Sequence, residues 1–402
     1  MESLLELYKI GHGPSSSHTM GPIKALNHFI ANFNDATSYE VVLFGSLALT
    51  GKGHLTDVAL HNVFNEKQKK GNVIFNYDLD NLYHPNTLII KAINKQGFVE
   101  HQTTYYSIGG GNLAIDGVNL NEENNVYPFA HFKEIKTYCH NNDCSYVDVV
   151  NNFDVPSINE DLLHIWQIMK EVIAKGLTTS GTLPGTLALE RKAHDLYNYF
   201  AEDESPVDEA KRKLFAYAYA VSEENASGGI VVTAPTCGSA GILPSVLYNA
   251  QLTSNYHDEQ IVDALKVAGL IGVTVKQNAS ISGAECGCQA ECGVAAAMAA
   301  AALAYLANFN LHQIEYASEV ALEHHLGLTC DPIGGYVQIP CIERNAVIAG
   351  RAYDAVLVAK HLTMNRRISL DDIIQTLYET GLDLNTDYKE TSRGGMAKLL
   401  KM

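Results

Sequence analysis

The run of small residues from Gly293 to Ala307 (GVAAAMAAAALAYLA) limits the possible folds of this chain more than any other feature. Alanine is the strongest helix former, and a helix without a polar face must be covered on all sides. The run is only about 15 residues of weak hydrophobicity and follows Glu285 and Glu291, whereas a bilayer span needs roughly 20 strongly apolar residues. We therefore predict a core helix that its neighbours approach closely, and no membrane partner.

Composition narrows the class of protein further. With 402 residues, 47% hydrophobic residues and a Pro count of 11, the chain is globular and long enough for two cores. A net charge of -17 argues against nucleic acid, which demands a basic face. The N-terminal MESLLELYKIGHG lacks the basic and apolar regions of a signal peptide, and eight cysteines without an even framework suit a reducing compartment. We expect a cytoplasmic protein.

The first 150 residues mix strand and helix signals. The alternating apolar pattern predicts strands over Glu40–Ala48, Asn86–Ile93 and Phe98–Ser107, and helices over Met20–Asn32 and Thr56–Asn65. Between residues 139 and 160 the composition shifts to Asn, Asp and Pro, which favour turns and linkers. We place a domain boundary near residue 150.

Helical periodicity dominates the rest of the chain. The predicted helices are Asp161–Lys175, Arg191–Phe200, Val207–Ser222, Gly241–Asn249, Asp258–Val275, Glu291–Ala307, His312–Leu326, Glu343–Leu362 and Leu370–Thr380. The acidic stretch 201–210 is interpreted as a solvated connection. The predicted fold class is an α+β N-terminal domain (1–150) followed by an all-α C-terminal catalytic domain (151–402).

Three cysteines carry the strongest chemical signal. Cys288, Cys330 and Cys341 stand among Gly, Pro and carboxylates in SGAECGCQAECG (282–293), GLTCDPIGG (327–335) and QIPCIERN (338–345). Cys341 follows Pro340 at a predicted helix start, where the dipole favours a thiolate. Three thiolates leave an iron–sulfur cluster one ligand short of four, and an iron with an open position acts as a Lewis acid. Inert buried cysteine is the alternative reading.

Two polar loops in the first domain are candidate substrate-binding or catalytic segments. GHGPSSSHTMGP (11–22) places hydroxyls and a histidine at a predicted helix start, where free N–H groups favour an anion. GSLALTGKGHLTD (45–57) delivers His54 on a tight turn, a position suited to proton transfer. The glycine-rich SIGGG (107–111) and TAPTCGSAGILP (233–244) are weaker candidates for a ligand-facing turn.

These motifs resemble, in order and across nearly the whole chain, the bacterial iron–sulfur L-serine dehydratases. GPSSSHTMGP, GSLALTGKGH, YYSIGGG, VVTAPTCGSAGILP, NASISGAECGCQ, EHHLGLTCDPIGGYVQIPCIERNA and YKETSRGGMA carry the resemblance. It implies a [4Fe–4S] cluster on Cys288, Cys330 and Cys341, L-serine as substrate, and a homodimer. Cys237, Cys286 and Cys292 depart from the family pattern, so an alternative ligand or a redox role stays open for them.

From the resemblance we expect the β-hydroxyl of serine to meet the open iron. His54 is the predicted base and His18 a second catalytic residue. The predicted substrate-binding residues are Ser16, Ser17, Thr19, Gly109, Gly110, Gly111 and Arg393. Alternatives are an iron–sulfur lyase acting on threonine or cysteine, a pyridoxal-phosphate lyase, and a non-enzymatic protein with structural zinc.

Overall fold

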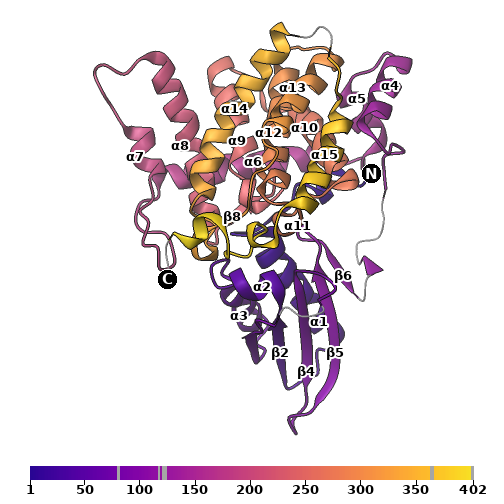
Figure 1. The fold of residues 1–402 in the computed structure, drawn as a ribbon, viewed down its shortest axis with the longest axis vertical. Helices are drawn as coiled ribbons and strands as arrows, with labels where there is room; N and C mark the ends of the chain where they lie inside the picture. The colour runs from indigo at the N-terminus through magenta and orange to yellow at the C-terminus, as the bar shows by residue number, and fades with distance from the viewer. Residues whose placement is uncertain (79–81, 116–117, 120–124, 363–365, 400–402) are drawn as a thin grey trace.

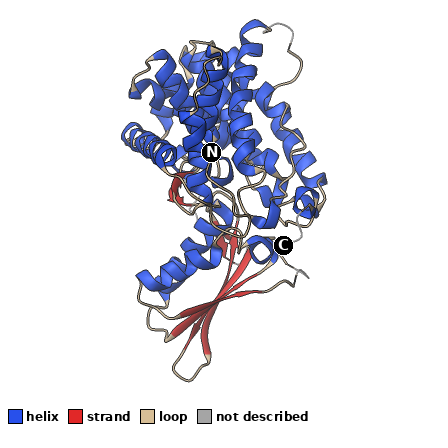
Figure 2. Cartoon of the chain, turned by 90° about the vertical axis from the view of Figure 1, so that its left-hand side faces the viewer, coloured by secondary structure: helices blue, strands red, loops and turns tan. Residues whose placement is uncertain are grey.

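The computed structural model describes residues 1–78, 82–115, 118–119, 125–362 and 366–399. An N-terminal α+β part with one large sheet lies at one end, and a helical part forms the rest (Figure 1). Figure 2 shows the same division from the side, with the large sheet below most of the helices. The predicted order of an α+β region followed by a largely helical region is confirmed at this level.

The α+β part is built on a sheet with strand order β3-β2-β4-β5-β6-β7. Strands β2 and β3 are parallel and the other neighbours are antiparallel. The strands are β2 (Ser38–Leu43), β3 (Gly71–Phe75), β4 (Thr87–Ile93), β5 (Val99–Ser107), β6 (Leu113–Ile115) and β7 (Val118–Asn119). Helices α1 (Gly21–Asn32) and α3 (Thr56–Glu66) pack on this sheet, because Leu26 and Phe29 share one core with Val41 and Ile90.

The helical part holds the largest apolar core of the described residues. Its helices are α4 (Phe132–Asn142), α5 (Tyr146–Phe153), α6 (Ile158–Thr178), α7 (Ala193–Asn198), α8 (Pro206–Ala226), α9 (Ile242–Ser254), α10 (Asp258–Asn278), α11 (Gly283–Cys286), α12 (Cys292–Leu306), α13 (Leu311–Glu323), α14 (Cys341–His361) and α15 (Leu370–Asp383). The long predicted helices are confirmed to within a few residues at each end.

Helix α12 is the alanine-rich run and lies at the centre of this bundle. It packs against α9, α10, α13 and α14 (Figure 1). The stretch Cys288–Leu306 is long and apolar enough to cross a membrane by composition, but 89% of it is buried inside the protein. Its small side chains let four helices approach one axis, so the prediction of a core helix is confirmed.

Two local predictions were wrong. The strand expected over Glu40–Ala48 ends at Leu43, and Gly45 turns with a positive φ of 57° into a short helix, α2 (Gly45–Thr50). Residues 139–160, read as turns and linker, contain parts of α4, α5 and α6. The Asn and Asp residues there act as caps: Ser145 and Asp148 form a reciprocal capping box at the start of α5.

The two parts are joined at several places along the chain. Strand β1 (Ile10–His12) pairs antiparallel with β8 (Ile230–Val232), which precedes α9. The first residues of the chain also pack against the helical part, because Leu4 and Leu7 contact Gly269 and Gly272 of α10. Residues 385–399 return to the junction between the sheet and the helices, where they are drawn in yellow (Figure 1). Loops from both parts therefore meet at one junction.

Candidate active site

The SSSHT segment forms a tight turn that leads directly into α1. Ser15 caps this turn by accepting a hydrogen bond from the backbone N–H of His18, and Ser16–Met20 follow as one wide helical turn. His18 is fully buried within it. The side chain of Ser17 lies 2.8 Å from Nδ1 of His18. The sequence thus uses one serine as the cap and a second one to contact the imidazole.

His54 lies on the Gly-Lys-Gly turn, just before α3. A Cβ on Gly53 would lie 2.4 Å from the backbone carbon of Gly335, so only glycine lets this turn touch the DPIGG loop of the helical part. The hydroxyl of Thr19 donates to the carbonyl of His54 at 2.9 Å. His54 is therefore held between the first loop of the chain and the segment that carries Cys330.

The two predicted histidines meet at a carboxylate that the sequence did not single out. Their rings stack with centroids 4.4 Å apart. Oε1 of Glu390 lies 3.5 Å from Nδ1 of His18 and 3.3 Å from Nε2 of His54. The ligand-type atoms of these three residues lie within 4.8 Å of one another, so the group could also hold a metal ion.

Hydrogen bonds on the outer sides of the rings fix their tautomers. Nδ1 of His54 lies 2.9 Å from the carbonyl of Thr50, which can only accept, so Nδ1 carries the proton. Ser46 donates to the carbonyl of Glu390 at 2.6 Å, and therefore accepts from Nε2 of His18 at 3.0 Å. Nδ1 of His18 then accepts from the hydroxyl of Ser17 at 2.8 Å, whereas Nε2 of His54 turns its lone pair toward Glu390. This lone pair and the carboxylate repel each other unless a proton or a cation is shared between them.

Burial and mutual charge control the protonation of this triad. Burial lowers the pKa of His18 to about 4, an effect that Glu390 opposes and His54 reinforces. For Glu390, burial acts to raise the pKa, but the neighbouring imidazoles lower it more, and the net pKa lies below its usual value. The lowered pKa values favour a neutral His18 beside an ionised Glu390 at neutral pH.

The structure brings together the three cysteines predicted as ligands. Cys288 lies in the 3-10 turn before α12, Cys330 lies before the DPIGG loop, and Cys341 is the first residue of α14. Thiol hydrogen bonds from Cys292 and Cys330, aided by Arg344, hold the pKa of Cys288 well below its usual value. Burial raises the pKa of Cys341, and the charge of Cys288 adds to that effect. These opposite shifts in pKa favour a deprotonated Cys288 with neutral thiols as its neighbours.

Two ionisable side chains, Arg344 and Glu291, lie beside the cysteines. Arg344 donates to the carbonyl of Thr329 at 2.9 Å and interacts with the thiolate of Cys288. Glu291 lies with Oε2 3.9 Å from Sγ of Cys330 and accepts from the hydroxyl of Thr236 at 2.7 Å. Burial, together with Cys288, raises the pKa of Glu291 well above its usual value. The raised pKa favours the neutral form of Glu291, and Arg344 is the cation that interacts with Cys288.

A backbone pairing connects the cysteines to the histidines. The N–H of Cys330 donates to Tyr388 and the N–H of Glu390 donates to the carbonyl of Cys330, at 2.8 and 2.7 Å. Glu390 adopts a positive φ of 57°, which turns its side chain away from this pairing. Residues 388–390, which carry the carboxylate of the triad, therefore lie directly beside Cys330.

The other predicted site residues lie around this junction. Ser16 and Ser17 are buried, while the hydroxyl of Thr19 is already engaged by His54. Gly109, Gly110 and Gly111 all have positive φ, and a Cβ on Gly109 would lie 3.2 Å from Ser282, close to the cysteines. Arg393 is partly exposed and pairs with Asp387 at 3.2 Å. Their roles toward a substrate stay predictions.

Sequence reasoning missed Glu390, Glu291, Arg344 and Ser46 as site residues. All four lie inside motifs that it quoted: YKETSRGGMA, SGAECGCQAECG, QIPCIERN and GSLALTGKGH. A carboxylate or arginine among glycines and cysteines is a usable signal for a buried charge. Their partners come from distant segments, however, so no local pattern identifies the contacts.

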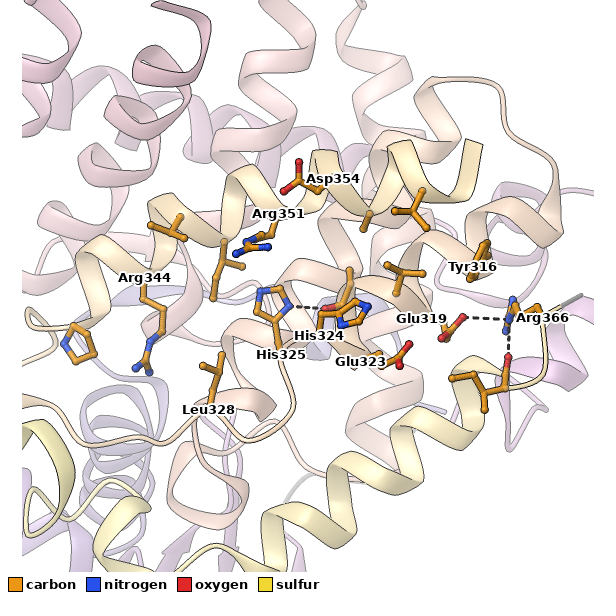
Figure 3. A pocket seen from close by; sticks show the side chains of 18 of the residues that line it. Tyr316, Glu319, Glu323, His324, His325, Leu328, Arg344, Arg351, Asp354 and Arg366 are labelled. Carbon is orange, nitrogen blue, oxygen red and sulfur yellow. Dashed lines mark hydrogen bonds and ion pairs between the residues drawn. The ribbon is translucent and has the colours of Figure 1, made fainter. Parts of the chain in front are cut away.

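Cavities lined by described residues border the site. One of about 320 Å³ is lined by Ser46, Ala284, Lys389, Thr391 and Arg393 among others, and so reaches the triad through Ser46. A larger one of about 880 Å³ lies between α13 and α14 (Figure 3). In Figure 3, Arg351 points toward His325, and Arg366 pairs with Glu319. Arg344 lines the larger cavity and also faces Cys288.

Comparison with known proteins places this geometry in a family. The family models for the serine dehydratase beta chain and alpha chain match residues 3–69 and 62–397. The chain belongs to the serine dehydratase family. Among its relatives are an L-serine dehydratase of Haemophilus influenzae, with 40% identity over 99% of both chains, and one of Streptomyces coelicolor, with 38% identity over 98% of both chains. An L-serine dehydratase of Helicobacter pylori is 39% identical over 99% of both chains.

Proposed function

We propose that this chain is an L-serine dehydratase that eliminates water from L-serine, giving pyruvate and ammonia, with a [4Fe–4S] cluster on Cys288, Cys330 and Cys341. Full-length similarity to curated L-serine dehydratases supports the reaction. The observation that carries the site is the junction where the cysteines meet the triad of His18, His54 and Glu390. A homodimer in the cytoplasm belongs to the same proposal.

The residues present fit such a cluster. Soft thiolates are the donors that iron–sulfur clusters take. Gly283 lies where a Cβ would be 3.2 Å from Sγ of Cys330, so glycine keeps the sulfur uncrowded. The buried guanidinium of Arg344 offsets the negative charge that thiolates and cluster share. When bound, the cluster supplies a Lewis-acidic iron that makes the β-hydroxyl a better leaving group, a contribution of several kcal/mol.

The histidine triad is suited to the proton transfer. Nδ1 of His54 is committed to Thr50, so Nε2 is the atom that accepts the α-proton of serine. Glu390, 3.3 Å from Nε2, stabilises the imidazolium that forms. Neutral His18, stacked on His54, keeps water and further positive charge away from the ring.

The cavity of about 320 Å³ offers a place for the substrate. It combines a hydroxyl from Ser46 with the cations Lys389 and Arg393. The chain as a whole has a net charge of -17, so the carboxylate of an amino-acid substrate needs a local positive charge in order to bind. Lys389 and Arg393 would provide this charge. Ser46 connects this cavity to His18 through its hydrogen bond. The substrate carboxylate would lie toward the cations, with the α-carbon toward the triad.

The function is tested on protein purified without oxygen. We expect iron and acid-labile sulfide in equal amounts, and pyruvate from L-serine. A panel with L-threonine and L-cysteine separates the related lyases, and borohydride inactivation would indicate pyridoxal phosphate. Metal-free protein with full serine turnover would refute the cluster, and a cluster-bearing protein inert toward the panel would refute the substrate class.

His54→Ala tests the base. We expect the cluster absorption to persist while turnover falls by about 10²–10⁴-fold. His61→Ala, on an exposed position of α3, is the matched control and should turn over normally. Unchanged turnover of His54→Ala would remove it as the base.

Cys330→Ala tests the ligand set. Loss of one thiolate should remove iron and sulfide together, with Cys144→Ala, partly exposed and outside the site, as the control. Retention of a complete cluster by Cys330→Ala would remove Cys330 from the ligand set.

A further inference from the structure

The sulfur atoms of Cys288 and Cys292 lie 3.4 Å apart, in van der Waals contact. Cys288 begins a 3-10 turn and Cys292 is the first residue of α12, so the two side chains, four residues apart, share one face. A disulfide joins its two sulfurs at about 2.0 Å, so the two side chains must approach each other further to form one. Both residues are buried, with 4% and 1% of their surface exposed.

Two other cysteines near the site, Cys286 and Cys237, have different packing partners. A Cβ on Gly381 of α15 would lie 2.6 Å from Sγ of Cys286, so this side chain is packed against α15. Sγ of Cys237 contacts the sulfur of Met20 at 3.5 Å. Cys330 is the other thiol that interacts with Cys288, and its sulfur also lies against Glu291. Cys288 therefore has two possible thiol partners, Cys292 and Cys330.

We propose that Cys288 and Cys292 form a peroxide-reactive site that closes as a disulfide once the cluster has been lost. The inference rests on the proposed function, because Cys288 is then a cluster ligand whose sulfur is protected while iron is bound. The oxidant is hydrogen peroxide. The sulfur of Cys288 attacks one peroxide oxygen, the O–O bond breaks, and a sulfenic acid and one water result. The sulfur of Cys292 then displaces hydroxide, so two thiols and one peroxide give one disulfide and two waters.

Position and charge assign these two roles. Cys288 is the attacking residue, because its sulfur is in contact with the sulfur of Cys292 and lies beside the guanidinium of Arg344. Cys292 is the resolving residue, since it is in contact with Cys288 and is not among the proposed ligands. The disulfide keeps Cys288 from irreversible oxidation to sulfinic acid. A thiol reductant would then return the ligand for cluster assembly.

Peptide mapping tests the pairing directly in the full-length chain. The variant Cys286→Ala leaves one cysteine in its peptide, and a glutamate-specific protease cuts after Glu285 and Glu291. After cluster removal and peroxide treatment, we expect peptide 286–291 linked to peptide 292–315. A link to peptide 324–343, which carries Cys330 and Cys341, or an unlinked sulfinic Cys288, would overturn the proposal.

A second measurement tests the protective role. Cys286→Ala and the double variant Cys286→Ala/Cys292→Ala are freed of cluster, exposed to peroxide, reduced with thiol, and supplied with iron and sulfide. Recovery of cluster absorption should be roughly fivefold lower in the double variant, with Cys288 found as sulfinic acid. Equal recovery in both variants would refute the protective role.

Failure of this inference is separable from failure of the proposed function. Peptide mapping reads the disulfide without reference to serine or to turnover. If anaerobic protein contains no iron or sulfide yet the disulfide forms, the proposed function is refuted and the disulfide inference is supported. If the cluster is present and the disulfide never forms, the proposed function is supported and the disulfide inference is refuted.

Discussion

At the scale of single residues, the site depends on a carboxylate shared by two buried imidazoles. Glu390 lies against both His18 and His54, and each ring is oriented from its far side by Ser46 or Thr50. An ionised carboxylate is the partner that an imidazole needs in order to take a proton inside a buried site. Glu390 is buried and is not a surface charge, and we propose that it acts in the proton transfer.

Glu390→Gln keeps the size of the side chain and removes its charge. We expect turnover to fall by about 10²–10⁴-fold with the iron and sulfide content unchanged, because the imidazolium of His54 loses its counter-charge. Steady-state assays with metal analysis check this. Glu379→Gln, on an exposed position of α15, should behave as the parent chain. Normal turnover by Glu390→Gln would contradict the assignment.

The buried His18 makes stability depend on pH. Its folded pKa is about 4, against the ordinary value of 6.5. Below about pH 6.5 the unfolded chain gains a proton there that the folded chain does not, so stability is lost as the pH falls toward 4. Between about pH 7 and pH 5 this costs about 2 kcal/mol. The urea midpoint should therefore fall over this range, and fall less in His18→Gln. Equal slopes would contradict the buried neutral imidazole.

At the scale of elements, α12 organises the helical part. Apart from Tyr305, every residue of this helix is buried, and four neighbouring helices contact it. Alanine at the contacts keeps the helix axes close. This close packing places the start of α12, with Cys288 just before it, in the middle of the site.

Ala300→Leu tests this packing. The side chain at position 300 is fully buried, so three additional carbon atoms must displace a neighbouring helix at a cost of about 1–3 kcal/mol. The urea midpoint should drop accordingly. Ala210→Leu, on an exposed position of α8, is the control and should change stability by less than about 0.5 kcal/mol. A fully stable Ala300→Leu would show that α12 is loosely packed.

At the scale of the whole molecule, the C-terminal segment connects the cysteines to the histidines. Cys330 pairs with residues 388–390 through its backbone, and Asp331 accepts from the N–H of Met396 at 2.6 Å. The same segment delivers Glu390 to the α+β part. Neither part holds a complete site without it.

A chain that ends at Leu384 tests this connection. It keeps the apolar core of the helical part, whose members end at Leu377, but loses the partners of Cys330 together with Glu390. We expect retained helical circular dichroism, loss of iron and sulfide, and loss of turnover. Glu390→Gln, by contrast, should lose turnover alone. A shortened chain with full iron content would contradict a structural role for the segment in holding Cys330.

The sequence by itself determined the long helices, the buried alanine helix and the three cysteines as a group, because periodicity and residue type are local properties. It also pointed to His18 and His54 through the polar loops that carry them. Tertiary structure decided that Glu390, which is 336 residues beyond His54 by sequence number, contacts a nitrogen of each of the two stacked rings, and that Cys292, not Cys286, touches Cys288. Such contacts depend on how distant backbones pair and on which face of a turn each side chain occupies, and no local pattern encodes either.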